Sequence, residues 1–221
     1  MALALFDLDN TLLAGDSDYL WGVFLAEQGI VDGAYYEREN QRFYDEYKQG
    51  TLDIFEFLSF SLKALAENDP ARLRALREQF VESKIRPIMS PASFELLDKH
   101  RQAGDTLMVI TATNSFVTRP IVSAFGVEHL IATEPEMDGE RYTGRVAGIP
   151  SFQNGKVKRL QSWMADQGMD LKGSWFYSDS HNDLPLLEQV DNPVAVDPDS
   201  TLETHARQQG WPIISLRHQW K

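Results

Sequence analysis

The sequence contains no cysteine, which excludes disulfide bonds, thiolate metal sites and a cysteine nucleophile. It also lacks any apolar run close to the roughly 20 residues that a membrane-spanning helix requires. The short apolar run at residues 2–6 leads directly into aspartates and does not resemble a signal peptide. We therefore expect a globular protein located in the cytoplasm.

Basic residues are few relative to acidic ones. The 221 residues include 21 Lys+Arg and 33 Asp+Glu, which gives a formal net charge of −12. A surface of this sign repels nucleic acids and anionic membranes, so we expect neither as a partner. A phosphorylated substrate would need local positive charge, from a metal ion or from individual lysines.

The sequence pattern divides the chain into two kinds of region. Residues 16–85 show helical spacing without a strand pattern, in segments at 19–28, 34–48, 51–65 and 70–84. The first of these helices is expected to be capped by Asp16 or Ser17 and the third by Thr51. From residue 87, apolar runs alternate with helical segments, which is typical of βαβ units in a parallel sheet. The expected strands are 2–6, 106–111, 129–133, 174–178, 193–196 and 212–216, with a hairpin strand at 141–147.

Acidic residues follow two of the predicted strands. Strand alternation places Asp7 and Asp9 on the same side of the chain after the first strand. Such a pair can bind a divalent cation or supply a nucleophile and an acid/base group. Ligands bind outside the carboxyl ends of the strands in open α/β sheets, where Thr111, Asp179 and Asp183 are also expected. The four aspartates offer hard oxygen ligands suited to Mg²⁺.

Lys156, at the start of a predicted helix, is the candidate cation for this group of acids. Lysines are mostly exposed, so an ordinary surface position is the alternative. Thr111 has an equally plain alternative, because threonine is common in strands and this one could simply end its strand.

Four segments of the sequence resemble the motifs of the haloacid dehalogenase-like (HAD) superfamily. They are FDLDNTLL after the first strand, VITAT at the second, Lys156, and YSDSHND. The helical insert resembles the C1-type cap of the phosphoserine-phosphatase-like (IB) branch. The resemblance implies a Rossmann-like α/β core of residues 1–14 and 86–221, with an inserted helical cap of residues 15–85.

The resemblance also implies a phosphatase with a role for each motif residue. Asp7 would be the nucleophile that forms an aspartyl-phosphate, and Asp9 would protonate the leaving alcohol and then activate water. The presence of Asp9 favours a phosphatase over the dehalogenases and P-type ATPases of the superfamily, which lack this acid. The remaining implied sites are phosphate binding by Thr111, Ala112 and Lys156, Mg²⁺ binding by Asp7, the Asp9 carbonyl and Asp179, and support from Asn182 and Asp183.

The substrate is expected to be a small phosphorylated metabolite, acted on by a monomer or homodimer. Phosphoserine phosphatases carry a Glu nine residues beyond the nucleophile that helps to hold the substrate ammonium, and Asp16 stands there in this chain. An acidic, aromatic cap entrance suits a cationic, ring-bearing amine. The branch that the sequence resembles includes phosphatases assigned to histidinol phosphate, and the resemblance makes this ester the leading candidate. Arg42 could instead hold a substrate carboxylate, as phosphoserine would require. The alternatives are a phosphoserine phosphatase, a phosphotransferase on the same fold, or a non-catalytic binding protein.

Overall fold

The computed structural model describes residues 2–217, and its centre is a seven-stranded sheet in the order β4-β3-β2-β1-β5-β6-β7. Every neighbouring pair is parallel except β3 and β4, which form an antiparallel hairpin. The predicted α/β fold with a parallel sheet is therefore confirmed. The strands are β1 (Leu3–Phe6), β2 (Thr106–Asn114), β3 (His129–Asp138), β4 (Arg141–Ala147), β5 (Trp175–Ser178), β6 (Asn192–Val196) and β7 (Ile213–Ile214).

Strand β1 lies in the middle of the sheet and has no exposed side chain. Leu3 and Leu5 pack into the core on one face, and Ala4 and Phe6 pack into the core on the other. This explains the uninterrupted apolar run, because a parallel strand covered on both faces needs apolar side chains at every position. Since β1 pairs with both β2 and β5, Asp7 emerges between the carboxyl ends of those two strands.

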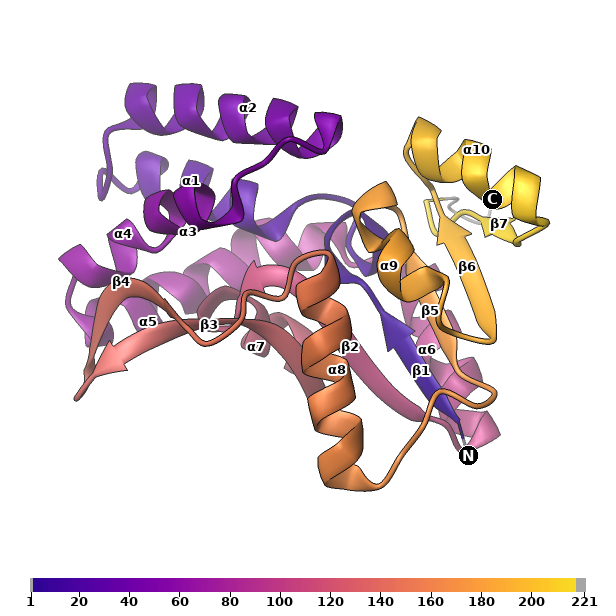
Figure 1. Ribbon diagram of the computed structural model, residues 1–221. Helices are drawn as coiled ribbons and strands as arrows, with labels where there is room; N and C mark the ends of the chain where they lie inside the picture. Colours follow the sequence, from indigo (N-terminus) through magenta and orange to yellow (C-terminus); the bar gives the residue numbers. More distant parts are fainter. Residues whose placement is uncertain (1, 218–221) are drawn as a thin grey trace.

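Helices cover both faces of the sheet (Figure 1). On the Phe6 face lie α6 (Pro91–Ala103) and α7 (Ser115–Ala124). On the Leu5 face lie α8 (Asn154–Gln167), α9 (Leu184–Leu187) and α10 (Ser200–Gln209). None of the helices in residues 2–217 has the length and apolar composition needed to cross a bilayer.

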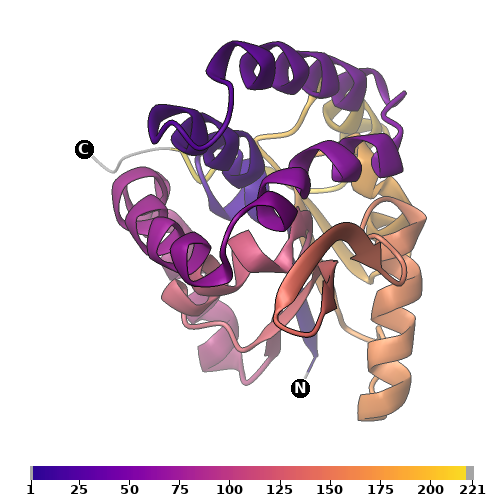
Figure 2. The ribbon, with the colours of Figure 1, turned by 90° about the vertical axis from the view of Figure 1, so that its left-hand side faces the viewer.

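A helical segment between β1 and α6 lies beyond the carboxyl ends of the central strands (Figure 1). It consists of α1 (Ser17–Glu27), α2 (Gly33–Gln49), α3 (Ile54–Ser61), α4 (Lys63–Glu67) and α5 (Pro70–Phe80), followed by single turns at Val81–Ile85 and Arg86–Ile88. Figure 2 shows α3 and α4 above the β3–β4 hairpin. A Cβ placed on Gly144 of β4 would lie 3.3 Å from the Ala66 Cβ of α4, so the two elements are in close contact.

Several expectations about the elements were wrong in detail. The third helix is capped by Asp53 rather than Thr51, because the Asp53 carboxylate accepts hydrogen bonds from the backbone N–H groups of Phe55 and Glu56. This helix is also divided into α3 and α4 at Leu62. Strand β3 continues to Asp138, five residues beyond its predicted end, because β4 supplies backbone partners for the extension.

Gly155 in the first turn of α8 permits a close backbone approach next to Lys156. A Cβ at this position would overlap the carbonyl oxygen of Pro150, and a backbone atom cannot move aside as a flexible side chain can. We predict that Gly155→Ala lowers the free energy of unfolding by about 1–3 kcal/mol, measured by urea denaturation. Gly33→Ala at the start of α2 is the control, because its Cβ would make an ordinary 3.5 Å contact with Ala26, and should change stability by no more than about 0.5 kcal/mol. Equal effects of the two substitutions would contradict the prediction.

Candidate active site

Lys156 is buried beneath the carboxyl ends of β1 and β5. Its Nζ donates hydrogen bonds to Asp7 Oδ1 at 2.8 Å and to Asp183 Oδ2 at 2.8 Å, and only 3% of the residue is exposed. Ser178 Oγ also donates to Asp183 Oδ2, at 2.7 Å. Burial disfavours the charged form of Lys156, but Asp183 and Asp7 outweigh burial and raise its pKa. The lysine is therefore a permanent cation held between two carboxylates.

Asp9 is oriented by hydrogen bonds from two different elements. The chain turns sharply after β1, with Asn10 in the left-handed region at φ 55°. Asp9 Oδ1 accepts a hydrogen bond from the Ser17 backbone N–H at 2.7 Å, and Oδ2 accepts one from Thr113 Oγ1 at 2.8 Å. Burial, and then Asp16, raise the pKa of Asp9 to about 6 despite these hydrogen bonds. A carboxyl group with this pKa can both donate and accept a proton near neutral pH.

The carboxylates outnumber the cations at this end of the sheet. Burial raises the pKa of Asp7 to about 7; Lys156 opposes the shift, while Asp183 and Asp9 add to it. Burial and the charges of Asp7 and Asp183 also raise the pKa of Asp179, whose Oδ1 accepts a hydrogen bond from Thr11 Oγ1 at 3.0 Å. Lys156 pairs with Asp7 and Asp183 but not with Asp179, so these three carboxylates together retain surplus negative charge.

This surplus charge fits a divalent cation. Within residues 2–217, no three His, Cys, Asp or Glu side chains converge as a set of metal ligands. The expected Mg²⁺ site, however, needs only the Asp7 and Asp179 carboxylates and the Asp9 backbone carbonyl. Mg²⁺ prefers few carboxylates and completes its shell with water, so the hard oxygen donors present here suit it.

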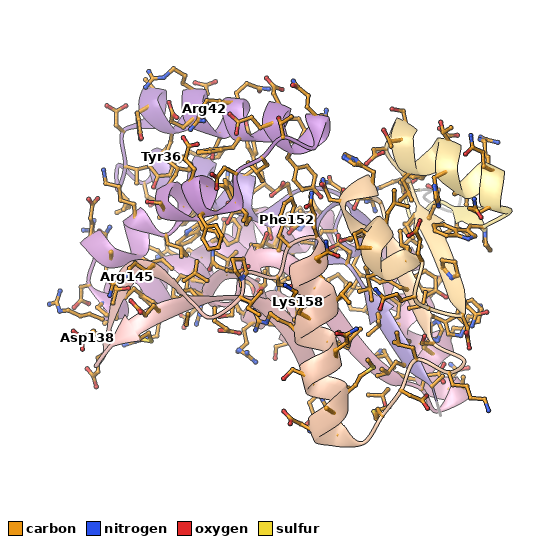
Figure 3. All side chains as sticks on the ribbon, in the orientation of Figure 1. Tyr36, Arg42, Asp138, Arg145, Phe152 and Lys158 are labelled. Atoms are coloured by element: carbon orange, nitrogen blue, oxygen red, sulfur yellow. The ribbon has the colours of Figure 1, made fainter. Side chains whose placement is uncertain are left out.

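One cavity joins these groups to the helical segment. Its sheet side includes Asp7, Asp9, Lys156 and the expected phosphate-binding residues Thr111 and Ala112. The opposite wall is mainly apolar and aromatic, and is formed by Tyr19, Phe43, Tyr44, Tyr47, Leu52, Ile54 and Phe57 together with the polar residues Asp16, Asp18 and Asn40. Figure 3 shows Phe152, a further lining residue, between α8 and the overlying α2.

The two expected substrate-binding residues occupy different positions. Asp16 lines the cavity, but its Oδ1 caps α1 by accepting hydrogen bonds from the backbone N–H groups of Asp18 and Tyr19, both at 2.9 Å. Arg42 does not line the cavity and forms ion pairs at 2.8–3.1 Å with Glu39, Glu46 and Glu56. A role for Arg42 in holding a substrate carboxylate is therefore not supported by its position (Figure 3).

Polar residues around the YSDSHND motif connect the two sides of the cavity. Asn182 Oδ1 accepts a hydrogen bond from Gln153 Nε2 at 2.9 Å, and its Nδ2 donates to the Tyr47 carbonyl at 3.3 Å. Tyr47 of α2 also donates from its hydroxyl to Ser180 Oγ at 2.8 Å. His181 lies outside the cavity lining and pairs with Asp199, the cap of α10, at 2.8 Å.

The sequence did not predict an individual role for several site residues. Thr113 follows Thr111 by two positions, and strand alternation could have placed both hydroxyls beside Asp9. Ser178 ends β5, and its partner Asp183 lies five residues further on, beyond the strand, so strand alternation does not predict their contact. Tyr47 had no such signal, because its partner Ser180 is 133 residues away in the sequence.

The chain is similar to known hydrolases and phosphatases. The family model for haloacid dehalogenase-like hydrolases matches residues 4–188. A protein named histidinol-phosphatase from Neisseria meningitidis serogroup C (strain 8013) is 43% identical over 97% of this chain and 99% of its own length. Phosphoserine phosphatase SerB1 from Mycobacterium tuberculosis (strain ATCC 25618 / H37Rv) is 31% identical over 98% of this chain and 71% of its own length.

Solved structures show the same fold. A protein of unknown function from Bordetella pertussis Tohama I superimposes with a TM-score of 0.92 at 46% identity, covering 97% of this chain and 98% of its own. A phospho-aspartyl intermediate analogue of phosphoserine phosphatase superimposes with a TM-score of 0.72, covering 99% of this chain and 94% of its own. Its identity is 17%, so this second likeness concerns the fold alone.

The raised pKa of Asp7 predicts how stability depends on pH in the absence of metal. Because the folded-state pKa lies above the ordinary value of 3.8, at about 7, wild-type stability should fall as pH rises between these values. Asp7→Asn removes the buried charge, so at pH 8 in EDTA we expect it to raise the free energy of unfolding by about 2 kcal/mol. Thermal unfolding from pH 4 to pH 8 measures this difference, which should grow with pH.

Asp105 provides a control, because its pKa is shifted in the direction opposite to that of Asp7. Burial acts against its charged form, but hydrogen bonds from His100 and the Ala2 backbone N–H outweigh burial and lower its pKa. Asp105→Asn should therefore cost about 1–3 kcal/mol at pH 7, and the loss should shrink as pH falls below about 4. A destabilised Asp7→Asn variant at pH 8 would contradict the surplus of negative charge inferred for the site.

Proposed function

This chain belongs to the haloacid dehalogenase-like hydrolase family and is a phosphatase, and we propose that it hydrolyses small amino-alcohol phosphates through an aspartyl-phosphate on Asp7. The observation that carries the proposal is the arrangement in one cavity of a carboxylate paired with a buried lysine, Asp7 with Lys156, and a second carboxyl group, Asp9, whose pKa is about 6. A nucleophile and a separate proton donor are the two groups that a covalent route to phosphate hydrolysis needs.

The proposed reaction has two displacements at phosphorus. In the first, an Asp7 oxygen forms a bond to phosphorus, the bond to the alcohol oxygen breaks, and Asp9 gives that oxygen its proton. In the second, Asp9 takes a proton from a water molecule whose oxygen attacks phosphorus, and inorganic phosphate leaves with the Asp7 carboxylate restored. Ser17 and Thr113 hold the Asp9 carboxyl group in place for both steps.

The other site residues neutralise and orient the transferring group. We assign phosphate binding to Thr111, the Ala112 backbone and Lys156, whose ammonium is fixed by Asp7 and Asp183. Asp7, Asp179 and the Asp9 carbonyl are the proposed Mg²⁺ ligands, with Asn182 and Asp183 in support. When bound, Mg²⁺ supplies positive charge that offsets the charge of the phosphoryl group.

We assign residues 15–85 as a cap over a core of residues 1–14 and 86–221. Support comes from the cavity, which has helical-segment side chains on one wall and sheet-end residues on the other. The hydrogen bond from the Tyr47 hydroxyl to Ser180 joins these two parts at 2.8 Å. The cap would open to admit substrate and close to exclude water during phosphorylation of Asp7.

Histidinol phosphate is the substrate that the cavity favours. The relative named histidinol-phosphatase supports this choice at 43% identity. Among the cavity-lining residues within residues 2–217, Lys156 is the only Lys or Arg, and it is already paired with two carboxylates. Phosphoserine carries a carboxylate that would find no free cation there, because Arg42 is outside the lining and paired with glutamates.

A phosphate-release assay with Mg²⁺ tests the substrate. We predict that kcat/KM for histidinol phosphate exceeds that for phosphoserine at least about tenfold, because leaving a buried charge without a partner costs more than about 1.4 kcal/mol. EDTA should abolish release, and added Mg²⁺ should restore it. A preference for phosphoserine would overturn the substrate assignment. A phosphorylated acceptor formed in place of inorganic phosphate would instead identify a phosphotransferase.

Substitutions of the two aspartates test the mechanism. Asp7→Asn should reduce phosphate release to background because an amide cannot act as the nucleophile. Asp9→Asn should lower kcat by about 10²–10⁴-fold through loss of proton transfer. Asp45→Asn, which removes the same charge from an exposed position on α2, is the control and should leave kcat within about twofold. Substantial turnover by Asp7→Asn would contradict the aspartyl-phosphate route.

A further inference from the structure

Asn40 of α2 is a buried polar residue that lines the cavity without a side-chain hydrogen-bond partner among residues 2–217. Only 7% of the residue is exposed, and it lines the cavity. No hydrogen bond in the described part of the chain uses its side-chain amide, whereas the side chains of Asn182, another lining residue, and of Asn114 at the end of β2 each make several. Buried amides are normally hydrogen-bonded, so an unpartnered one at a cavity wall indicates a ligand.

Gly22 of α1 creates the space that Asn40 occupies. A Cβ on Gly22 would lie 2.7 Å from Asn40 Nδ2 and 3.4 Å from Tyr36 Cδ1. Glycine inside a helix is less favourable than alanine by about 1 kcal/mol, yet Gly22 lies in the middle of α1. The glycine allows α2 to approach α1 closely enough to hold the Asn40 amide at the cavity.

Asp18 lies one helical turn before Gly22, on the same face of α1. It lines the same cavity, and its carboxylate receives one long hydrogen bond, from Asn114 Nδ2 at 3.4 Å. Within residues 2–217 it forms no ion pair, whereas Arg42, Lys84 and other cations of the helical segment pair with surface glutamates. The Asp18 carboxyl group therefore faces the cavity without a cationic partner, and burial together with the charges of Asp16 and Asp9 raises its pKa.

We propose that Asp18 and Asn40 form a head-group subsite that binds a protonated nitrogen of the substrate. The Asp18 carboxylate accepts one N–H of this cation and the Asn40 side-chain oxygen accepts another, while the nearby ring of Phe43 contacts its apolar part. The inference rests on the proposed function and deepens it. The substrate class is phosphate esters that carry a protonated amine or imidazole and no carboxylate. The main substrate-binding role is thereby assigned to Asp18 instead of Asp16, which caps α1.

Calorimetric titration of the full-length protein with histidinol, the alcohol without its phosphate, tests the subsite without requiring turnover. Asp18→Asn should raise Kd about tenfold to hundredfold, as expected for loss of a charge-assisted hydrogen bond. Asn40→Leu, which keeps the size of the side chain, should raise Kd about fivefold. Asp45→Asn removes a charge from α2 outside the cavity and should leave Kd within about twofold.

Gly22→Ala provides an independent test, because it leaves both proposed ligands chemically intact. The added methyl group should displace the Asn40 amide and raise Kd for histidinol about threefold to tenfold, and Gly33→Ala is its control. Thermal unfolding of each variant shows whether it is folded. Asp18→Asn should unfold at or above the wild-type temperature, because it removes a half-buried carboxyl group that has no cationic partner within residues 2–217.

The outcomes separate this inference from the proposed function. Values of Kd for Asp18→Asn and Asn40→Leu within about twofold of wild type, or a wild-type protein that does not bind histidinol, would overturn the subsite. Hydrolysis of p-nitrophenyl phosphate, which has no cationic nitrogen, reports on the phosphatase chemistry alone. If Asp18→Asn and Asn40→Leu still hydrolyse p-nitrophenyl phosphate and bind histidinol as the wild type does, the subsite is overturned and the aspartyl-phosphate mechanism still stands.

Discussion

The arrangement of the site depends on one buried ammonium group, that of Lys156. Asp7 follows β1 and Asp183 follows β5, so parallel strand pairing brings two carboxylates together that repel each other without a cation. Removing the cation would leave both buried carboxylates without a counter-charge, a change that typically destabilises a protein by about 3–5 kcal/mol. Helix α8 carries this cation to the strand ends, and Gly155 allows the tight backbone turn immediately before it. The lysine thus allows several carboxylates to be buried together at the ends of β1 and β5.

The sheet and its carboxylates could be predicted because their signals are local. A fully apolar run followed by two aspartates marks a buried strand end, and the same reading applies to Asp179 and Asp183. The helical segment was harder. Thr51 and Asp53 are both good capping residues, and nothing local decides between them. Arg42 was expected near the substrate, although Glu39 and Glu46 stand three and four positions away, at the spacing of helical ion pairs.

The features that no local pattern could reveal are contacts between helices. Asn40 gains its significance from Gly22, and neither residue stands out in the sequence by itself. The aromatic residues of α2 and α3 could have been either core or cavity wall, and the structure shows that one ring can be both. Phe43 is 3% exposed, packs against Phe57 and Phe60 at 5.3 Å between ring centroids, and lines the cavity. The same packing that stabilises the helical segment therefore shapes the binding site.

The hydrogen bond from the Ser17 backbone N–H connects Asp9, the proposed proton donor, directly to the first residue of α1. Helix α1 cannot move away from the sheet without breaking this hydrogen bond to one Asp9 carboxylate oxygen. The orientation of Asp9 therefore depends on whether α1 is packed against the sheet. In an open conformation Asp9 would be misaligned for proton transfer, so Asp7 would be phosphorylated more slowly by an ester that the helical segment does not yet enclose.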